Sequence, residues 1–246
     1  MAVLSMARLS AGIGRTFPSG SVGFKLRLSE PAGPCPARRQ GRAGRAWHFM
    51  SNVHLFELIN AAPHPEAWQL HLAIALAQWL IYLLPAGMAW AWLRGDRVAR
   101  LDIVGMLLST LLALGVAQVV VYAWPQPRPF ALHLGTQLLP HADDPGLPSD
   151  HVTVFWSLAL SALFTERFAV WGFPLLAGGL AVGWSRVFLG VHFPYDILAA
   201  LPVAGIGAVI ARAVRPATMP LVLPLLAVHD RWMTVLRARL HLNRRT

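Results

Sequence analysis

The sequence predicts an all-α integral membrane protein, a bundle of five to six transmembrane helices. Two observations predict this class. Hydrophobic residues make up 56% of the 246-residue chain and charged residues only 13%, a composition typical of proteins embedded in lipid. Two stretches of 22 residues also contain no charge at all, and about 20 apolar residues are enough to cross the hydrocarbon core of a bilayer.

The expected transmembrane helices follow one another along the middle of the chain. They comprise residues 72–93, 103–124, 152–165, 168–185 and 197–211. The first two are the uncharged stretches. The other three are shorter, but a helix can extend past its uncharged centre and a terminal arginine can place its charge at the interface, so we count them as spans. A further apolar stretch, 217–228, contains Pro220 and Pro224, which disfavour a regular sixth helix.

The chain divides into three parts by composition. Residues 1–49 contain eight Lys or Arg against one acidic residue, many Gly, Pro and Ser, and no apolar period long enough for a core, so we expect a disordered basic extension. An equally weighted alternative is that Met50 is the biological start. Residues 50–215 form the membrane domain. Residues 216–246 form a basic cytoplasmic tail or, in part, a sixth membrane segment.

The formal charge of +10 invites a nucleic-acid-binding interpretation, but the charge distribution argues against it. Most of the excess lies in residues 1–49. After Met50 every basic residue is an arginine, and eleven of these thirteen fall on one side of the membrane if the five helices alternate. The positive-inside rule assigns that side to the cytoplasm. Arg128 and Arg186 fall on the opposite, outer side and therefore need a local reason.

Three short stretches bring polar residues to that outer side. These are WPQPRPF (124–130), LPSDHV (147–152) and SRVFLGVHFPYD (185–196). Polar groups at membrane depth are costly unless they are paired or perform chemistry. The polar residues are Arg128, Ser149, His151, Ser185, Arg186, His192 and Asp196.

These residue types suit the transfer of a phosphoryl group. Two arginines can bind phosphate oxygens in a bidentate way. Ser149 occupies the position before a helix where free backbone N–H groups bind anions. Two histidines provide a nucleophile and a general acid. Asp196, four residues after His192, can hold the imidazole in one tautomer.

The sequence indicates no metal site and no cofactor. Cys35 is the single cysteine, which excludes a Cys-based metal site. His133 and His141 lie near Asp143 and Asp144 in the outer loop. We interpret them as solvated loop residues, and a metal site there is the alternative.

At these residues the chain resembles the phosphatidic acid phosphatase type 2 superfamily, whose signature is K-x6-RP, then PSGH, then SR-x5-H-x3-D. The matching stretches are RP at 128–129, PSDH at 148–151 and SRVFLGVHFPYD at 185–196, and the last is complete in every defining position. Val121 stands where the signature has lysine, and Asp150 where it has glycine. At both of these positions the chain resembles the bacterial undecaprenyl-diphosphate phosphatase branch.

The resemblance implies roles for the matching residues. His192 is expected to attack the terminal phosphorus and form a phosphohistidine, Asp196 to orient it, and His151 to protonate the leaving oxygen. The charge of Asp150 is expected to help keep His151 protonated. The expected substrate-binding residues are Arg128, Ser149, Asp150, Ser185 and Arg186.

The implied reaction is metal-independent hydrolysis of undecaprenyl diphosphate to undecaprenyl phosphate and inorganic phosphate, which recycles the lipid carrier of cell-wall synthesis. The site is expected at the outer face of a bacterial cytoplasmic membrane, with the polyprenyl diphosphate and the bilayer as partners and no nucleic acid. One alternative is another lipid phosphate phosphatase, for phosphatidate, phosphatidylglycerophosphate or lipid A, or a phosphotransferase. From a different class, the alternative is a non-catalytic lipid-binding or transport protein.

Overall fold

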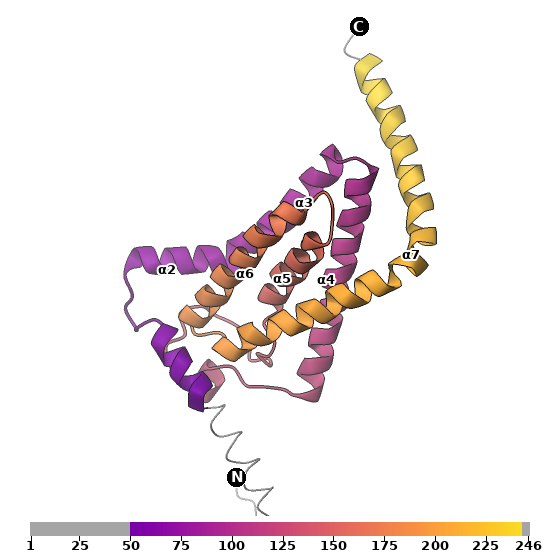
Figure 1. Cartoon of the computed structure of the whole chain (residues 1–246). Helices are drawn as coiled ribbons and strands as arrows, with labels where there is room; N and C mark the ends of the chain where they lie inside the picture. The colour runs from indigo at the N-terminus through magenta and orange to yellow at the C-terminus, as the bar shows by residue number, and fades with distance from the viewer. Residues whose placement is uncertain (1–49, 243–246) are drawn as a thin grey trace, which may run out of the picture. The chain divides into compact units, whose positions relative to one another are not determined.

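The computed structural model describes residues 50–242, with side chains through residue 235, and every regular element in that range is a helix. The predicted fold class is thereby confirmed, whereas the expected extension 1–49 lies outside the described residues. A first helix covers residues 50–59. The later helices are α2 (Ala67–Ile74), α3 (Leu83–Arg94), α4 (Arg97–Ala123), α5 (Asp150–Leu163), α6 (Ala169–Phe188) and α7 (Pro194–Leu242) (Figure 1).

Three helical segments are long and apolar enough to cross a membrane by length and composition: Ala67–Arg94, Arg97–Ala123 and Pro194–Val235. They contain three of the expected spans, 72–93, most of 103–124, and 197–211. The other two expected spans correspond to α5 and α6, of 14 and 20 residues. The short α5 packs against α4, α6 and α7, so it lies among the other helices of the bundle.

The first span, Ala67–Arg94, is not a regular α-helix throughout. A π-helical turn, Ala75–Trp79, and a 3₁₀ turn, Leu80–Tyr82, connect α2 to α3 without a break. Such turns change the direction of carbonyls and side chains, and they are frequent at functional sites. This irregular segment reappears below as one wall of the candidate site.

The C-terminal end differs from the expectation of an interrupted sixth segment. Residues 217–228 continue α7 as one helix in spite of Pro216, Pro220 and Pro224. Each proline removes one backbone hydrogen bond and bends a helix, yet helices in membranes tolerate such positions. Residues 216–242 therefore continue α7 and form no separate helix.

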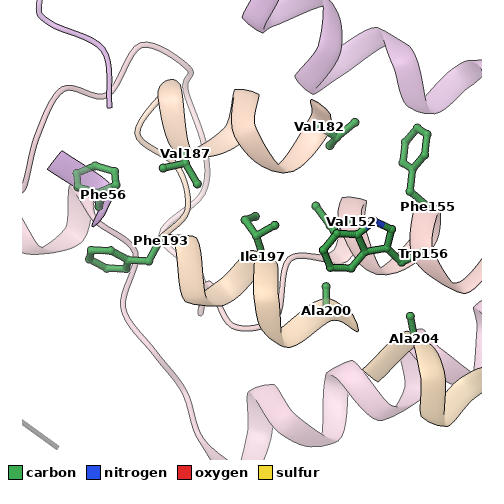
Figure 2. Close-up of a cluster of buried hydrophobic side chains, with 10 residues drawn as sticks. All are labelled: Phe56, Val152, Phe155, Trp156, Val182, Val187, Phe193, Ile197, Ala200 and Ala204. Carbon is green, nitrogen blue, oxygen red and sulfur yellow. The ribbon is translucent and has the colours of Figure 1, made fainter. Parts of the chain in front are cut away.

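The core lies around α5 and is made by side chains from four helices (Figure 2). Phe155 and Trp156 of α5 meet Val182 of α6 and the small residues Ala200 and Ala204 of α7. In lipid the tails are as apolar as the side chains, so helix association depends on close packing, which small residues permit. The complete cluster is Phe56, Val152, Phe155, Trp156, Val182, Val187, Phe193, Ile197, Ala200 and Ala204.

The two ends of the bundle carry different polar residues. At one end, Asp96 forms an ion pair with Arg167, and Arg100 pairs with Asp230 of α7. At the other end, the loop between α4 and α5 packs on the α6–α7 turn, where the Leu138 amide donates to the Leu189 carbonyl at 3.0 Å. The predicted polar constellation lies at this second end.

Candidate active site

His192 and Asp196 form a buried pair at the start of α7. The imidazole Nδ1 lies 3.3 Å from the Asp196 Oδ2, and the Phe193 amide donates to the same oxygen at 2.9 Å. His192 is only 2% exposed. Burial, reinforced by the positive charges of Arg186 and Arg128, lowers the pKa of His192 well below its ordinary value. A neutral ring that donates from Nδ1 leaves Nε2 unprotonated, as a nucleophile requires.

The turn that precedes this pair depends on a glycine. Gly190 has φ +79°, in the left-handed region that favours glycine. A Cβ at this position would also clash with the Thr136 carbonyl of the α4–α5 loop. Asn60, at the end of the first helix, joins the same two segments by donating to the carbonyls of Thr136 and Phe188, at 3.0 and 3.1 Å. The turn that carries His192 is thus held against the loop by backbone contacts.

Arg128 approaches His192 from the α4–α5 loop. Its Nη1 lies 3.0 Å from the His192 Nε2 and donates to the Val191 carbonyl at 2.9 Å. Its Nε donates to the Asp144 carboxylate at 2.9 Å. Although the residue is only 5% exposed, its charge is paired, and one face of the guanidinium stands beside the candidate nucleophile.

A cavity of ≈ 430 Å³ has His141, His151 and Arg186 in its polar lining. Residues 77–82, the irregular turns of the first span, form much of the rest of its wall. Arg186, at the end of α6, places Nη2 3.1 Å from the His141 Nε2 and donates from Nη1 to the Ala77 carbonyl at 3.3 Å. The π-helical turn therefore supplies an acceptor for a site residue.

Comparison with known proteins identifies the family. Residues 102–220 match the PAP2 superfamily. Over 164 residues the chain is 36% identical to YbjG of Escherichia coli (strain K12), by name a provisional undecaprenyl-diphosphatase, covering 66% of this chain and 82% of that protein. The chain belongs to the PAP2 superfamily. The expected membership in the undecaprenyl-diphosphatase branch is confirmed with it.

Two further comparisons agree with the PAP2 assignment. Undecaprenyl-diphosphatase BcrC of Bacillus subtilis (strain 168) is 29% identical over 153 residues, which cover 62% of this chain and 78% of that one. The crystal structure of Aquifex aeolicus LpxE has a TM-score of 0.51 at 22% sequence identity and covers 65% of this chain and 93% of that chain. At that identity the LpxE likeness supports the PAP2 fold and nothing finer.

The three PAP2 motifs lie together in the structure, but not every polar side chain in them is available to bind a substrate. Ser149 is the N-cap residue of α5, as predicted, but its hydroxyl does not cap the helix. The residue is fully buried, and its Oγ has no hydrogen-bond partner within the described range. Its O–H is therefore available to a bound anion.

Two predicted substrate-binding residues have no side-chain hydrogen bond or ion pair with the other members of the site in the described range. The buried Ser185 hydroxyl donates to the Val182 carbonyl of its own helix at 2.7 Å. Its proton is therefore used within α6. Asp150 is exposed, and the structure gives it no hydrogen bond or ion pair with His151 among the described side chains. A role for Asp150 in keeping His151 protonated stays a prediction.

The interpretation of His141 as a solvated loop residue is wrong. Its side chain is 21% exposed, and its Nδ1 lies 3.6 Å from the Asp144 carboxylate. Burial lowers its pKa below the ordinary value. Asp144, also assigned to the solvated loop, pairs with Arg128. The PAP2 motifs contain neither residue, and nothing in the sequence marked them as neighbours of Arg128 and Arg186.

The metal alternative finds no support in the arrangement of the loop. Among residues 50–242 no three His, Cys, Asp or Glu side chains gather closely enough to hold a metal ion. His141 faces a guanidinium, which repels a cation. The alternative ligands His133 and Asp143 do not join it.

Proposed function

We propose that this PAP2 protein is a membrane lipid phosphatase that hydrolyses undecaprenyl diphosphate to undecaprenyl phosphate and inorganic phosphate. One observation carries the proposal: a buried histidine, oriented by a carboxylate through Nδ1, presents its other nitrogen to an arginine. This combination suits nucleophilic attack on a phosphoryl group. The names of two curated relatives, the undecaprenyl-diphosphatases of B. subtilis and Sulfolobus acidocaldarius, support the choice of substrate.

The reaction proceeds in two steps. The His192 Nε2 attacks the terminal phosphorus, an N–P bond forms, and the bond from that phosphorus to the bridging oxygen breaks. Undecaprenyl phosphate leaves with a proton from His151. Water then attacks the phosphohistidine, with His151 as the base, so that inorganic phosphate departs and His192 is restored. Asp196 stabilises the positive charge of the imidazole while it carries the phosphoryl group.

Two arginines and one serine stabilise the transferring group. The Arg128 Nη1 lies beside the attacking nitrogen, His192 Nε2. A phosphate oxygen that takes the place of Nε2 as the acceptor of this N–H brings its phosphorus next to Nε2, in position for in-line attack. Arg186 has a buried Nε without a partner among the described residues, like the Ser149 hydroxyl. Buried donors of this kind stabilise developing negative charge strongly, and removing one typically costs about 10²–10³-fold in rate.

The reaction requires no metal ion or cofactor, because His192 supplies the nucleophile and the arginines the positive charge. We expect the purified protein, in detergent and EDTA, to release phosphate from undecaprenyl diphosphate faster than from phosphatidate, phosphatidylglycerophosphate or lipid A. The measurement is colorimetric phosphate release across this panel at matched lipid concentrations.

Other outcomes of this assay favour the alternatives. A preference for another lipid would assign the same chemistry to that lipid, and no release from any of them would favour a lipid-binding or transport protein. Loss of activity in EDTA that a divalent cation restores would favour the metal alternative at His133, His141 and Asp143.

The site faces the outer side of a bacterial cytoplasmic membrane in this proposal, where the released carrier can be recycled for cell-wall synthesis. The distribution of arginines supports this orientation. Six arginines lie at the end of the bundle opposite the candidate site or take part in the ion pairs of that end. They are Arg94, Arg97, Arg100, Arg167, Arg212 and Arg215. Positive charge of this kind remains in the cytoplasm.

Labelling with a membrane-impermeant thiol reagent tests the orientation. In a Cys35→Ser background, Ala142→Cys is expected to react in intact cells and Arg97→Cys only after lysis. Both positions are exposed. Reaction of both cysteines from the same side would contradict the topology.

A further inference from the structure

Four side chains form a continuous chain of contacts across the mouth of the site. Arg186 contacts His141, His141 approaches Asp144, and Asp144 pairs with Arg128. The two middle members come from the α4–α5 loop and lie outside the PAP2 motifs. The loop therefore joins both candidate phosphate-binding arginines, and His141 is its member in the cavity.

His141 lies at the distance from the nucleophile that a diphosphate can bridge. The centroids of the His141 and His192 rings are 6.4 Å apart, with the rings edge to face. His151, the proposed acid for the leaving oxygen, lines the same cavity as His141 and Arg186, whereas His192 and Arg128 do not line it. The cavity is thus on the leaving-group side of the reaction.

This arrangement separates the two phosphates of the substrate. The terminal phosphate must reach His192 and Arg128. The inner phosphate, which stays on the lipid, follows the bridging oxygen towards His151 and enters the cavity. The lining side chains with hydrogen-bond donors, besides His151, are Gln78, Trp79, Tyr82, His141 and Arg186. Of these, His141 and Arg186 are the ones that can carry a positive charge. A lipid monophosphate has an alkyl oxygen and carbon at this place and gives these side chains no anion to bind.

We propose that His141 is a specificity-determining residue that binds the inner phosphate of a lipid diphosphate. The inference rests on the function proposed above and deepens it. In the resting site the His141 Nε2 accepts from Arg186, and its Nδ1 lies 3.1 Å from the Ala142 carbonyl and 3.6 Å from the Asp144 carboxylate. When Arg186 turns to the inner phosphate, the imidazole takes up a proton beside that anion and Asp144, and Nε2–H donates to a phosphate oxygen.

The test compares a prenyl diphosphate with the prenyl monophosphate of the same chain length. For His141→Ala we expect kcat/KM for the diphosphate to fall by about 10- to 100-fold, the loss of one charged hydrogen bond. The kcat/KM of the monophosphate as a substrate is expected to change by less than about 3-fold, because its only phosphate must lie at His192 to react.

Two variants separate binding from a merely structural role. His141→Glu offers Arg186 an acceptor but has no donor and repels the phosphate, so we expect it to lose at least as much diphosphate activity as His141→Ala. The matched control is His133→Asn, which removes an exposed histidine from the same loop, and asparagine tolerates the φ of +55° found there. It is expected to behave as wild type.

The inference is overturned if His141→Ala lowers kcat/KM for the diphosphate and the monophosphate equally, or if His141→Glu restores diphosphate hydrolysis. Either result would make His141 a structural support for Arg186. A wild-type protein that releases phosphate from no lipid would instead contradict the proposed function, so the two failures are distinguishable.

Discussion

His192→Ala is expected to abolish phosphate release from lipid diphosphates and lipid monophosphates alike, with a loss on the order of 10⁶-fold, as when the nucleophile of another hydrolase is removed. Both substrate classes depend on the same N–P bond, so the loss does not depend on the leaving group. The imidazole is held by Asp196 at 3.3 Å and faces Arg128 at 3.0 Å, and within the described part no other histidine has both contacts.

Two measurements support the assignment of the nucleophile. Rates are compared on both substrates, and wild-type protein mixed with terminally ³²P-labelled lipid diphosphate is quenched and tested for an acid-labile protein label. We expect the label in wild type and its absence in His192→Ala. Since His192 is buried, the thermal stability of His192→Asn is recorded beside it to separate lost chemistry from lost folding. A labelled His192→Ala protein would contradict the mechanism.

The second large effect depends on the leaving group. In a diphosphate the departing oxygen belongs to a phosphate, whose last proton has a pKa of about 6. In a monophosphate it belongs to an alcohol, a far more basic alkoxide that needs a proton in the transition state. General acid catalysis typically contributes about 10²–10⁴-fold. We therefore expect His151→Ala to reduce turnover of lipid monophosphates more than turnover of lipid diphosphates.

This prediction is the reverse of the one for His141, although both histidines line the same cavity. Rates of wild type, His151→Ala and His141→Ala on the two substrates therefore separate a proton donor from a phosphate ligand in one experiment. Equal loss on both substrates in His151→Ala would mean that His151 mainly binds phosphate. The general acid would then have to be sought among the other groups of the cavity.

Much of this arrangement could be predicted because it depends on local spacing. Apolar stretches of sufficient length predict helices in lipid whatever their neighbours are, since the backbone must satisfy its own hydrogen bonds there. The pairing of His192 with Asp196 is also local, because His192 lies two residues before α7 and Asp196 lies in the first turn of that helix. The motif stretches were likewise recognisable from residue order.

Other features depend on contacts between distant segments, which spacing does not reveal. His141 meets Arg186 across 45 residues, and Asp144 meets Arg128 across 16. In the sequence both looked like polar residues of an outer loop. The structure makes them part of the site because Asn60, Thr136 and the turn at Gly190 hold that loop against the end of α6.

The same difference between local spacing and distant contacts explains the two serines and the C-terminal part of α7. Position predicted Ser149 and Ser185 as site residues, but the direction of a hydroxyl depends on which acceptor is nearest. Ser185 has the Val182 carbonyl within reach, whereas the Ser149 hydroxyl has no acceptor among the residues that the structure describes. Pro220 and Pro224 disfavoured a regular sixth helix over residues 217–228, yet α7 continues through them. Local sequence thus determined the helices and the reactive pair, while packing between distant segments decided which polar groups face the substrate, because burial leaves each donor only the partners that the fold brings to it.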